Sequence, residues 1–532
     1  MKLYINGEFH AMDISRNVYS GLLENEGEIA DIGDASELIK KYPDAEVVDL
    51  DGKCVIPGII DTHAHIFTSA YSEKTWELYI PKSVKELLEN LAFRVKNAKP
   101  GDWIVYKNTY PLRISELRYP TLSELDAVAP ENPVVVDGYY SSQLNTKAIE
   151  TIDFEKLPES ASMEYDEDGK LTGLFKCSNT YITSFADFGS GDEKEALVNL
   201  MREYNKCGIT MAVEAMSAVP YLKTMKEVYD EGRQTIRIRH TMLAFENVAK
   251  EATELDLGDR DFTRVCFLKN LLDGGFLTGT AYMEYPYKNE GLKNIFGIDT
   301  HGEAEYGIVQ CDTEKLCESI RLARKYGLQY GAHCVGSGAS KKLLDAYKIV
   351  NADSPLKGER HSLIHADFMD DAAIDEANGM GISVLFQPAW HYMDAPALEY
   401  VLDEHDACRF MKYSTILKAD LAAAGSDHMV KHDPDESVNP YNPFTGMYNM
   451  VTCRARDGKA YGEESRVSRD AALASYTSEA SRVCFDENLI GTLAVGKRAD
   501  FAVLDKNYFT CPEEEIPGIR SQMTVVDGKR VW

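Results

Sequence analysis

The sequence predicts an α/β protein, a (β/α)8 TIM barrel with a small β-sandwich domain formed by the N- and C-terminal segments. Two observations support this fold. Helical patterns alternate with short apolar strands from residue 58 to about residue 484, whereas residues 1–57 and 485–532 contain short strand-like pieces broken by turns. Alternation of helices and strands over such a length is typical of a parallel barrel, which builds its site at the carboxyl ends of the strands.

The two ends of the chain have the same pattern of short strand-like pieces separated by turns. Strand-like pieces are predicted at residues 2–7, 17–22, 46–58 and 496–505, and a pair of strands is predicted around Asp527-Gly528. The dipeptide Asp-Gly is typical of tight β-hairpins. Because neither end is long enough to bury both faces of a sheet alone, we expect the ends to pair in one small domain.

The middle of the chain supplies helices and strands in alternation. Helices are predicted where apolar residues recur at three- and four-residue intervals, at 83–98, 192–207, 312–327 and 370–381. The first strand starts at Val55, and further strands are predicted at 133–138, 209–215, 264–275, 328–334, 361–366, 382–388 and 422–428. The loops 281–312 and 430–445 are long enough to shape a pocket.

Composition limits the partners of the protein. Acidic residues outnumber basic ones by 86 to 57, which gives a formal net charge of -29. Such a surface repels nucleic acid and anionic membranes, so we expect neither as a partner. The chain starts without an apolar signal segment, and its 11 cysteines form no CxxC pairs. We therefore expect a soluble cytoplasmic protein with reduced thiols.

His63 and His65 point to function, because a strand sends alternate side chains to the same face. Two imidazoles on one face can share a metal ion. Other side chains with suitable chemistry also end predicted strands: Lys269, His333, His365 and Asp427. The carboxyl ends of barrel strands meet at one face, so these six side chains are predicted to form one site.

The six side chains predict a metal-dependent hydrolase. Imidazole and carboxylate groups are ligands of Zn2+ and similar divalent ions, and such sites leave a coordination position for water. We expect one or two divalent ions, with Zn2+ as the expected metal. Structural alternatives stay open: His333 and His365 as core histidines, Asp427 as the cap of a following helix, and Lys269 as an ordinary ion-pairing residue.

The motifs around these residues resemble those of the amidohydrolase superfamily. The opening PGIIDTHAHI, the GSD at 425–427 and the tail GTLAVGKRADFAVLD at 491–505 carry the resemblance. The phrases KNLLDGGFLTGTA, GAHCVGSGA, LIHADF and LFQPAW, in this order, are similar to the amidohydrolase-3 branch, which includes YtcJ-like proteins and N-substituted formamide deformylases. The resemblance covers nearly the whole chain and implies a metal-dependent barrel beside a β-sandwich.

The resemblance also implies roles for the ligands. It assigns His63, His65 and Asp427 to the more buried metal ion, and His333 and His365 to a second ion. Lys269 would bridge both ions after N6-carboxylation by CO2, which turns a potential cation into an oxygen donor. Lys176, in GLFKCSN, is the alternative lysine.

The expected reaction is hydrolysis of a carbon–nitrogen bond other than a peptide bond, in an amide, an N-substituted formamide or a cyclic amide (EC 3.5 class). Divalent ions would lower the pKa of a bound water and polarise the substrate carbonyl. Asp427 would accept the proton of that water and pass it to the leaving nitrogen. A metal-dependent lyase or isomerase on the same scaffold, and a metal-binding protein without turnover, are the alternatives.

The sequence departs from the family pattern where substrate contacts are expected. Members commonly have a histidine where Tyr139 or Tyr140 stands, and often Gly-Asp where this chain has Gly336-Ser337. Candidates for the pocket wall are Tyr140, His391, Arg409 and His428, and aromatic candidates for stacking are Trp76, Tyr282 and Trp390. Arg409 could anchor a substrate carboxylate. We expect a small-molecule substrate and, as is common among such barrels, a homo-oligomer, in the simplest case a dimer.

Overall fold

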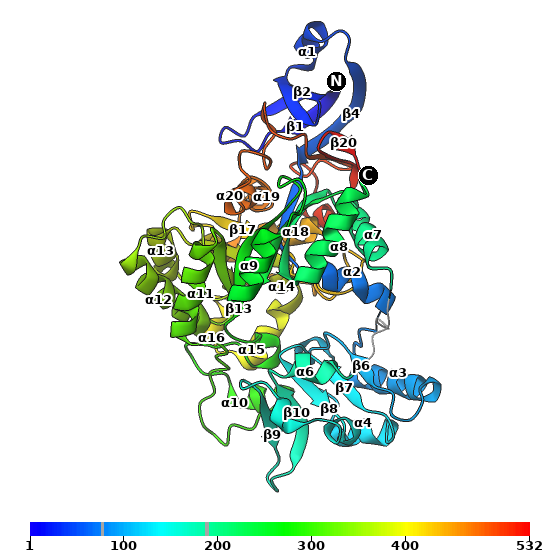
Figure 1. Ribbon diagram of the computed structural model, residues 1–532, viewed down its shortest axis with the longest axis vertical. Coiled ribbons are helices and arrows are strands. Elements are labelled where there is room, and N and C mark those ends of the chain that lie inside the picture. Colours follow the sequence, from blue (N-terminus) through cyan, green and yellow to red (C-terminus); the bar gives the residue numbers. More distant parts are fainter. Residues whose placement is uncertain (76–78, 187–190) are drawn as a thin grey trace.

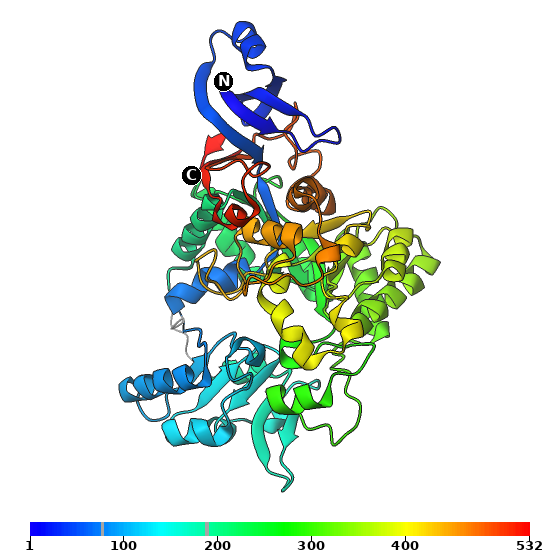
Figure 2. The same ribbon diagram turned by 180° about the vertical axis from the view of Figure 1, so that it is seen from behind.

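The computed structural model describes residues 1–75, 79–186 and 191–532. The chain is arranged in three tiers (Figure 1). A sheet that contains both termini lies at one end, a barrel surrounded by helices lies in the middle, and a second small sheet lies at the opposite end. The reverse view shows the same order (Figure 2).

Both ends of the chain contribute to one seven-stranded sheet, as predicted. Its strand order is β20-β19-β18-β4-β1-β2-β3. The central strand β4 pairs in parallel with β1 and antiparallel with β18, where Val55 lies opposite Val503. The strands are β1 (Lys2–His10), β2 (Val18–Asn25), β3 (Glu28–Gly33), β4 (Glu46–Pro57), β18 (Phe501–Leu504), β19 (Ser521–Val526) and β20 (Lys529–Arg530), and helix α1 spans Ala35–Lys41. This terminal sheet leads directly into the barrel, whose first strand begins at Ile59.

Eight parallel strands form the barrel sheet, in the order β17-β16-β15-β14-β13-β12-β11-β5. They are β5 (Ile59–Ala64), β11 (Ile209–Ser217), β12 (Arg237–Leu243), β13 (Thr263–Leu271), β14 (Gln329–Cys334), β15 (Ser362–His365), β16 (Ser383–Phe386) and β17 (Ala422–Ala424). The sheet closes just beyond the ends of β5 and β17. There the backbone N–H of Asp427 donates to the carbonyl of His63 (2.7 Å), and the N–H of His65 donates to the carbonyl of His428 (2.8 Å). Closure of the barrel therefore brings three of the predicted ligands together.

The predicted helices form close to their expected bounds. Three of them lie around the barrel as α7 (Glu193–Lys206), α11 (Thr313–Lys325) and α13 (Asp371–Met380). Each begins after an aspartate whose side chain accepts a backbone N–H of the first turn, which is a favourable N-cap. Other helices of the barrel tier are α2 (Ile66–Thr75), α8 (Val219–Asp230), α9 (Glu246–Glu254), α12 (Ser337–Asp353), α14 (Pro388–Asp394), α15 (Leu398–Val401), α16 (Glu404–Ala407), α17 (Tyr413–Ile416), α18 (Pro443–Thr452), α19 (Arg469–Ser475) and α20 (Ser478–Val483).

The third tier corrects the predicted organisation of the middle of the chain. Residues 133–138, expected as a barrel strand, form β7 (Val134–Asp137) in a separate five-stranded sheet of order β6-β7-β8-β10-β9. Its other strands are β6 (Ile104–Tyr106), β8 (Ser141–Leu144), β9 (Ser162–Tyr165) and β10 (Leu171–Lys176), accompanied by α3 (Val84–Asn97) and α4 (Leu122–Val128). We call residues 79–186 the insertion, because they lie between barrel strands β5 and β11 (Figure 1).

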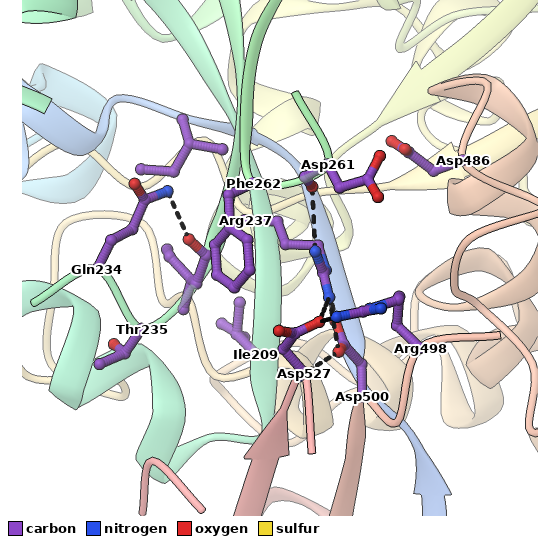
Figure 3. A network of polar contacts seen from close by, with 12 residues as sticks. Ile209, Gln234, Thr235, Arg237, Asp261, Phe262, Asp486, Arg498, Asp500 and Asp527 are labelled. Atoms are coloured by element: carbon purple, nitrogen blue, oxygen red, sulfur yellow. Dashed lines mark hydrogen bonds and ion pairs between the residues drawn. The ribbon is translucent and has the colours of Figure 1, made fainter. Parts of the chain in front are cut away.

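The barrel strand absent from the prediction is β12, which begins Arg-Ile-Arg-His. Charged residues argue against a buried strand, yet the side chains of Arg237 and Arg239 are both fully buried. Arg237 donates to both carboxylate oxygens of Asp500 (2.7 and 3.0 Å), and Arg239 donates to both oxygens of Asp486 (2.8 and 2.9 Å). Figure 3 shows the network around Arg237 and Asp500, which also includes Arg498 and Asp527. These ion pairs compensate the buried charges and attach the C-terminal segment to the barrel.

Two expectations from composition can be compared with the structure. No helix within the described residues is long and apolar enough to cross a membrane. The cysteines are all unpaired, and most of them are buried.

Candidate metal centre and active site

His63, His65 and Asp427 form a compact group of ligand atoms. Oδ1 of Asp427 lies 3.4 Å from Nε2 of His63 and 3.3 Å from Nε2 of His65. One ligand atom from each of the three residues lies within 4.8 Å of the others. Two donors that are each about 2.1 Å from one tetrahedral ion are about 3.4 Å apart, so this spacing fits a shared divalent ion.

Asp61 holds the two segments that carry these ligands. Its Oδ1 accepts the backbone N–H groups of His63 (3.1 Å) and Ser426 (2.9 Å), and its Oδ2 accepts the Ser426 hydroxyl (2.6 Å). Burial raises the pKa of Asp61 to about 6. A Cβ atom on Gly425 would lie 2.6 Å from the backbone nitrogen of His63, so the close approach requires glycine. This supporting role of Asp61 is absent from the sequence predictions, although the residue stands in the Asp-Thr-His motif.

Lys269, His333 and His365 end the neighbouring strands β13, β14 and β15 and face the same centre. Nζ of Lys269 lies 3.4 Å from Nε2 of His63, and no described residue forms an ion pair with this lysine. The ring of His365 lies 5.0 Å from that of His63 and 4.5 Å from that of His333, measured between centroids. The structure therefore brings the six residues together.

Burial sets the charge of these groups. It lowers the pKa of Lys269 to about 8. Burial and the nearby Lys269 ammonium lower the pKa of His333 to about 3, and they hold the pKa of His63 well below its ordinary value. Neutral imidazole is the form that ligates metal ions, so the charge state of the histidines fits a metal site.

Gln387 and Trp390 fix the orientation of His365. The side-chain oxygen of Gln387 lies 2.6 Å from Nδ1 of His365, so Nε2 is the ring nitrogen that remains for a metal ion. The Trp390 ring stacks on the imidazole with centroids 4.7 Å apart. The backbone at His365 and Asp427 has positive φ angles of 78° and 53°. Such angles are uncommon outside glycine and are concentrated at functional sites.

A pocket with a cavity volume of about 50 Å³ lies over this centre. The insertion contributes Tyr110, Gly138, Tyr139 and Tyr140 to its wall. The Tyr140 hydroxyl lies 3.0 Å from Nε2 of His333, which is also 3.0 Å from the carbonyl oxygen of Gly274. The insertion therefore completes the pocket, although the sequence does not predict it as a separate unit. It places Tyr140 in the pocket wall, where the sequence predicts a substrate contact.

The other predicted wall residues lie outside the pocket lining. Nδ1 of His391 accepts from the Asn449 amide (3.0 Å), Arg409 donates to Asp370 (3.0 Å), and Nδ1 of His428 lies 2.9 Å from the Tyr204 hydroxyl. Among the aromatic candidates, Trp390 lines the pocket, Tyr282 does not, and Trp76 lies outside the described residues.

Two alternatives from the sequence can now be judged. Lys176 forms an ion pair with Glu164 (2.7 Å) and does not line the pocket, whereas Lys269 does. Asp427 does not cap a helix, because the next helix, α18, is capped by Asn442.

Arg113 attaches the insertion to the barrel beside Asp427. Its Nε and Nη2 both donate to the Asp394 carboxylate at 2.7 Å, and Nη2 also donates to Oδ1 of Asn439 at 3.2 Å. The Asn439 amide in turn donates to the carbonyl of Asp427 (2.8 Å) and lies 3.4 Å from its Oδ2. A continuous set of hydrogen bonds thus connects the insertion with the predicted general base.

Comparisons with known proteins agree with this architecture. A model of the amidohydrolase family matches residues 46–532. The N-substituted formamide deformylase of Arthrobacter pascens is 26% identical over 549 residues, covering 99% of this chain and 97% of that protein. YtcJ of Bacillus subtilis (strain 168) is 23% identical, covering 95% and 94% of the two chains. The solved structure of an uncharacterized metal-dependent hydrolase from Pyrococcus horikoshii OT3 shares the fold with a TM-score of 0.71 and 21% identity, covering 96% of this chain and 99% of that chain.

Proposed function

The chain belongs to the amidohydrolase family, and from this premise we propose that it is a metal-dependent hydrolase of carbon–nitrogen bonds other than peptide bonds. The substrates would be amides, N-substituted formamides or cyclic amides. The observation that carries the proposal is the position of Asp427, within 3.4 Å of both histidines of the first strand and in the lining of the pocket over them. The similarity to an N-substituted formamide deformylase supports the same class of bond.

The residues present fit divalent metal ions, and we propose Zn2+ because the donors are imidazoles and a carboxylate. His63, His65 and Asp427 would hold one ion, and His333 and His365 would hold a second. Lys269 would bridge them as the N6-carboxylated side chain. This assignment is supported by its buried Nζ, which contacts His63 and has no counter-ion among the described residues. When bound, such ions lower the pKa of a water molecule and polarise the scissile carbonyl.

The protein groups move the protons. Asp427 accepts a proton from the attacking water as the carbon–oxygen bond forms, and it then delivers that proton to the nitrogen, so that the carbon–nitrogen bond breaks and the amine leaves. Asn439 holds the backbone of Asp427 through a hydrogen bond of 2.8 Å, which keeps the carboxylate in place. Tyr140 presents its hydroxyl beside His333, where it can donate to the substrate carbonyl oxygen.

Metal content tests the proposed centre. Wild-type protein purified without chelator is expected to contain close to two divalent ions per chain by elemental analysis. His63→Ala and Lys269→Ala should each lose bound metal, because each removes a ligand. Lys176→Ala is the matched control, since Lys176 is a buried lysine that pairs with Glu164 away from the pocket. Metal content unchanged by Lys269→Ala would remove this lysine from the centre, and absence of metal in the wild type would contradict the proposed function.

The contacts by which Arg113 attaches the insertion to the barrel give a second prediction. Arg113→Lys is expected to lower kcat about 10-fold or more, as is usual when groups that orient the residues of a metal site are changed. Lysine cannot make the bidentate contact with Asp394 and cannot reach Asn439 at the same time. Steady-state kinetics would measure the effect.

Arg118→Lys is the matched control for this experiment. Arg118 makes a similar two-pronged contact with Glu124 (2.7 and 2.9 Å) in the insertion but away from the pocket. Equal losses of kcat in the two variants would show that Arg113 has no particular connection with the chemistry.

A further inference from the structure

Apart from the metal centre, the pocket wall is mostly apolar and aromatic, with Thr278 and Asn439 as neutral polar members. The insertion supplies three tyrosines, and the barrel tier supplies the apolar and aromatic side chains of Met216, Leu271, Phe276, Leu277, Trp390 and Met429. Tyr139, Tyr140 and Trp390 are partly exposed, so their rings are available to a ligand. Aromatic and methionine side chains of this kind favour a flat or bulky apolar group.

Among the described residues, no lysine, arginine, aspartate or glutamate outside the metal centre lines this wall. Apart from histidines and tyrosines, the ionisable groups of the lining are Lys269 and Asp427, and both belong to the metal centre. Arg113 lies behind Tyr110, 5.1 Å from the ring centroid, and its charge is already paired with Asp394. Arg409, the predicted anchor for a substrate carboxylate, instead contacts Asp370 outside the lining. A substrate carboxylate would therefore have no cation to pair with in the wall.

The hydrogen-bonding side chains that remain in the wall are neutral, and they include Tyr140, Thr278, Trp390 and Asn439. The Trp390 indole N–H is buried and has no acceptor among the described residues. The Tyr140 hydroxyl lies beside His333 and can donate as well as accept. Such donors suit the carbonyl oxygen of an amide better than an anion that needs full charge compensation.

We propose that the site accepts uncharged amides that carry an aromatic or other bulky apolar group, and that it rejects amides with a carboxylate beside the scissile bond. This inference rests on the proposed function and adds the substrate class. The apolar wall binds the neutral group, while a carboxylate in the same place loses its hydration without gaining an ion pair.

A matched pair of substrates tests the inference. N-formyl-2-phenylethylamine and N-formylphenylalanine differ only in the carboxylate, and hydrolysis gives formate and the corresponding amine in both cases. For the metal-loaded enzyme, kcat/KM is expected to be at least about 100-fold higher for the neutral compound. Equal values, or a higher value for the acid, would overturn the inference and leave the proposed function intact.

A new cation in the wall should change this preference. Met216→Arg places a guanidinium at the end of β11 in the lining, and it is expected to reduce the preference for the neutral compound at least about 10-fold. Ile349→Arg on the exposed face of α12 is the matched control and should leave the preference unchanged. The same preference in both variants would count against the proposed wall.

If neither compound is cleaved, formamide hydrolysis as the function is contradicted. A binding measurement then tests the proposed substrate class separately from the proposed function. Calorimetric titration of the same two compounds into the metal-loaded protein would then decide the inference, with binding at least about 10-fold tighter expected for the neutral compound. Equal or tighter binding of the acid would overturn it.

Discussion

Replacing Asp427 by asparagine is expected to lower kcat at least about 100-fold, the usual range for removal of a general acid–base group. Asparagine keeps an oxygen atom close to His63 and His65, so most of the metal should stay bound. It cannot accept the proton of the attacking water or pass one to the leaving nitrogen. The expected result is therefore a protein with near-normal metal content and little turnover, measured by elemental analysis and steady-state kinetics on the same preparation.

Asp420→Asn is the control for this variant. Asp420 is exposed and precedes β17, whereas Asp427 follows it, so the two aspartates lie at opposite ends of one strand. We expect wild-type kinetics for Asp420→Asn. Near-normal turnover of Asp427→Asn would show that another group moves the protons, and a parallel loss of metal and activity would indicate that Asp427 acts mainly as a ligand.

The centre could be predicted because its chemistry follows a general rule of barrels. Polar residues that end buried parallel strands meet at one face, so His333 and His365 could be grouped with His63 without knowledge of the structure. The strand sequences around them are short apolar runs that contain little charge. For these residues, local pattern and three-dimensional arrangement agree.

The strand order could not be obtained fully, because β12 and β7 give misleading patterns. Arg237 and Arg239 make β12 look exposed, and only their pairing with aspartates more than 200 positions later in the chain explains their burial. β7 has the sequence Val-Val-Val-Asp, which is typical of a barrel strand, but it belongs to the insertion. Periodicity shows that a strand is buried but not which sheet buries it.

The residues that support the site could not be identified from the sequence, because their contacts also join positions far apart in the chain. Arg113 contacts Asp394 and Asn439, and both contacts link positions more than 280 residues apart. Nothing in the local sequence of Arg113 distinguishes it from a surface arginine. Gln387 follows the apolar run of β16, so its position at a strand end was the signal that could have identified it.

Replacing Arg237 by methionine is expected to destabilise the protein by about 3–5 kcal/mol, because it removes one partner of a buried ion pair. The Asp500 carboxylate would keep its buried position but lose both hydrogen bonds from Arg237. It would retain the backbone N–H of Asp527 as a donor (2.7 Å), which compensates only part of the charge. The urea concentration at the midpoint of unfolding would measure the effect, and the joint between the barrel and the C-terminal strands (Figure 3) is where we expect the loss.

Two comparisons distinguish this mechanism from a general loss of packing. Lys226→Met removes an exposed ion pair with Asp230 on α8 and is expected to leave the midpoint unchanged, because water replaces that contact. The double variant Arg237→Met/Asp500→Leu should recover part of the loss, since it no longer buries an unpaired carboxylate. A double variant that is less stable than Arg237→Met would indicate that the packing of both side chains, rather than the isolated charge, determines stability at this joint.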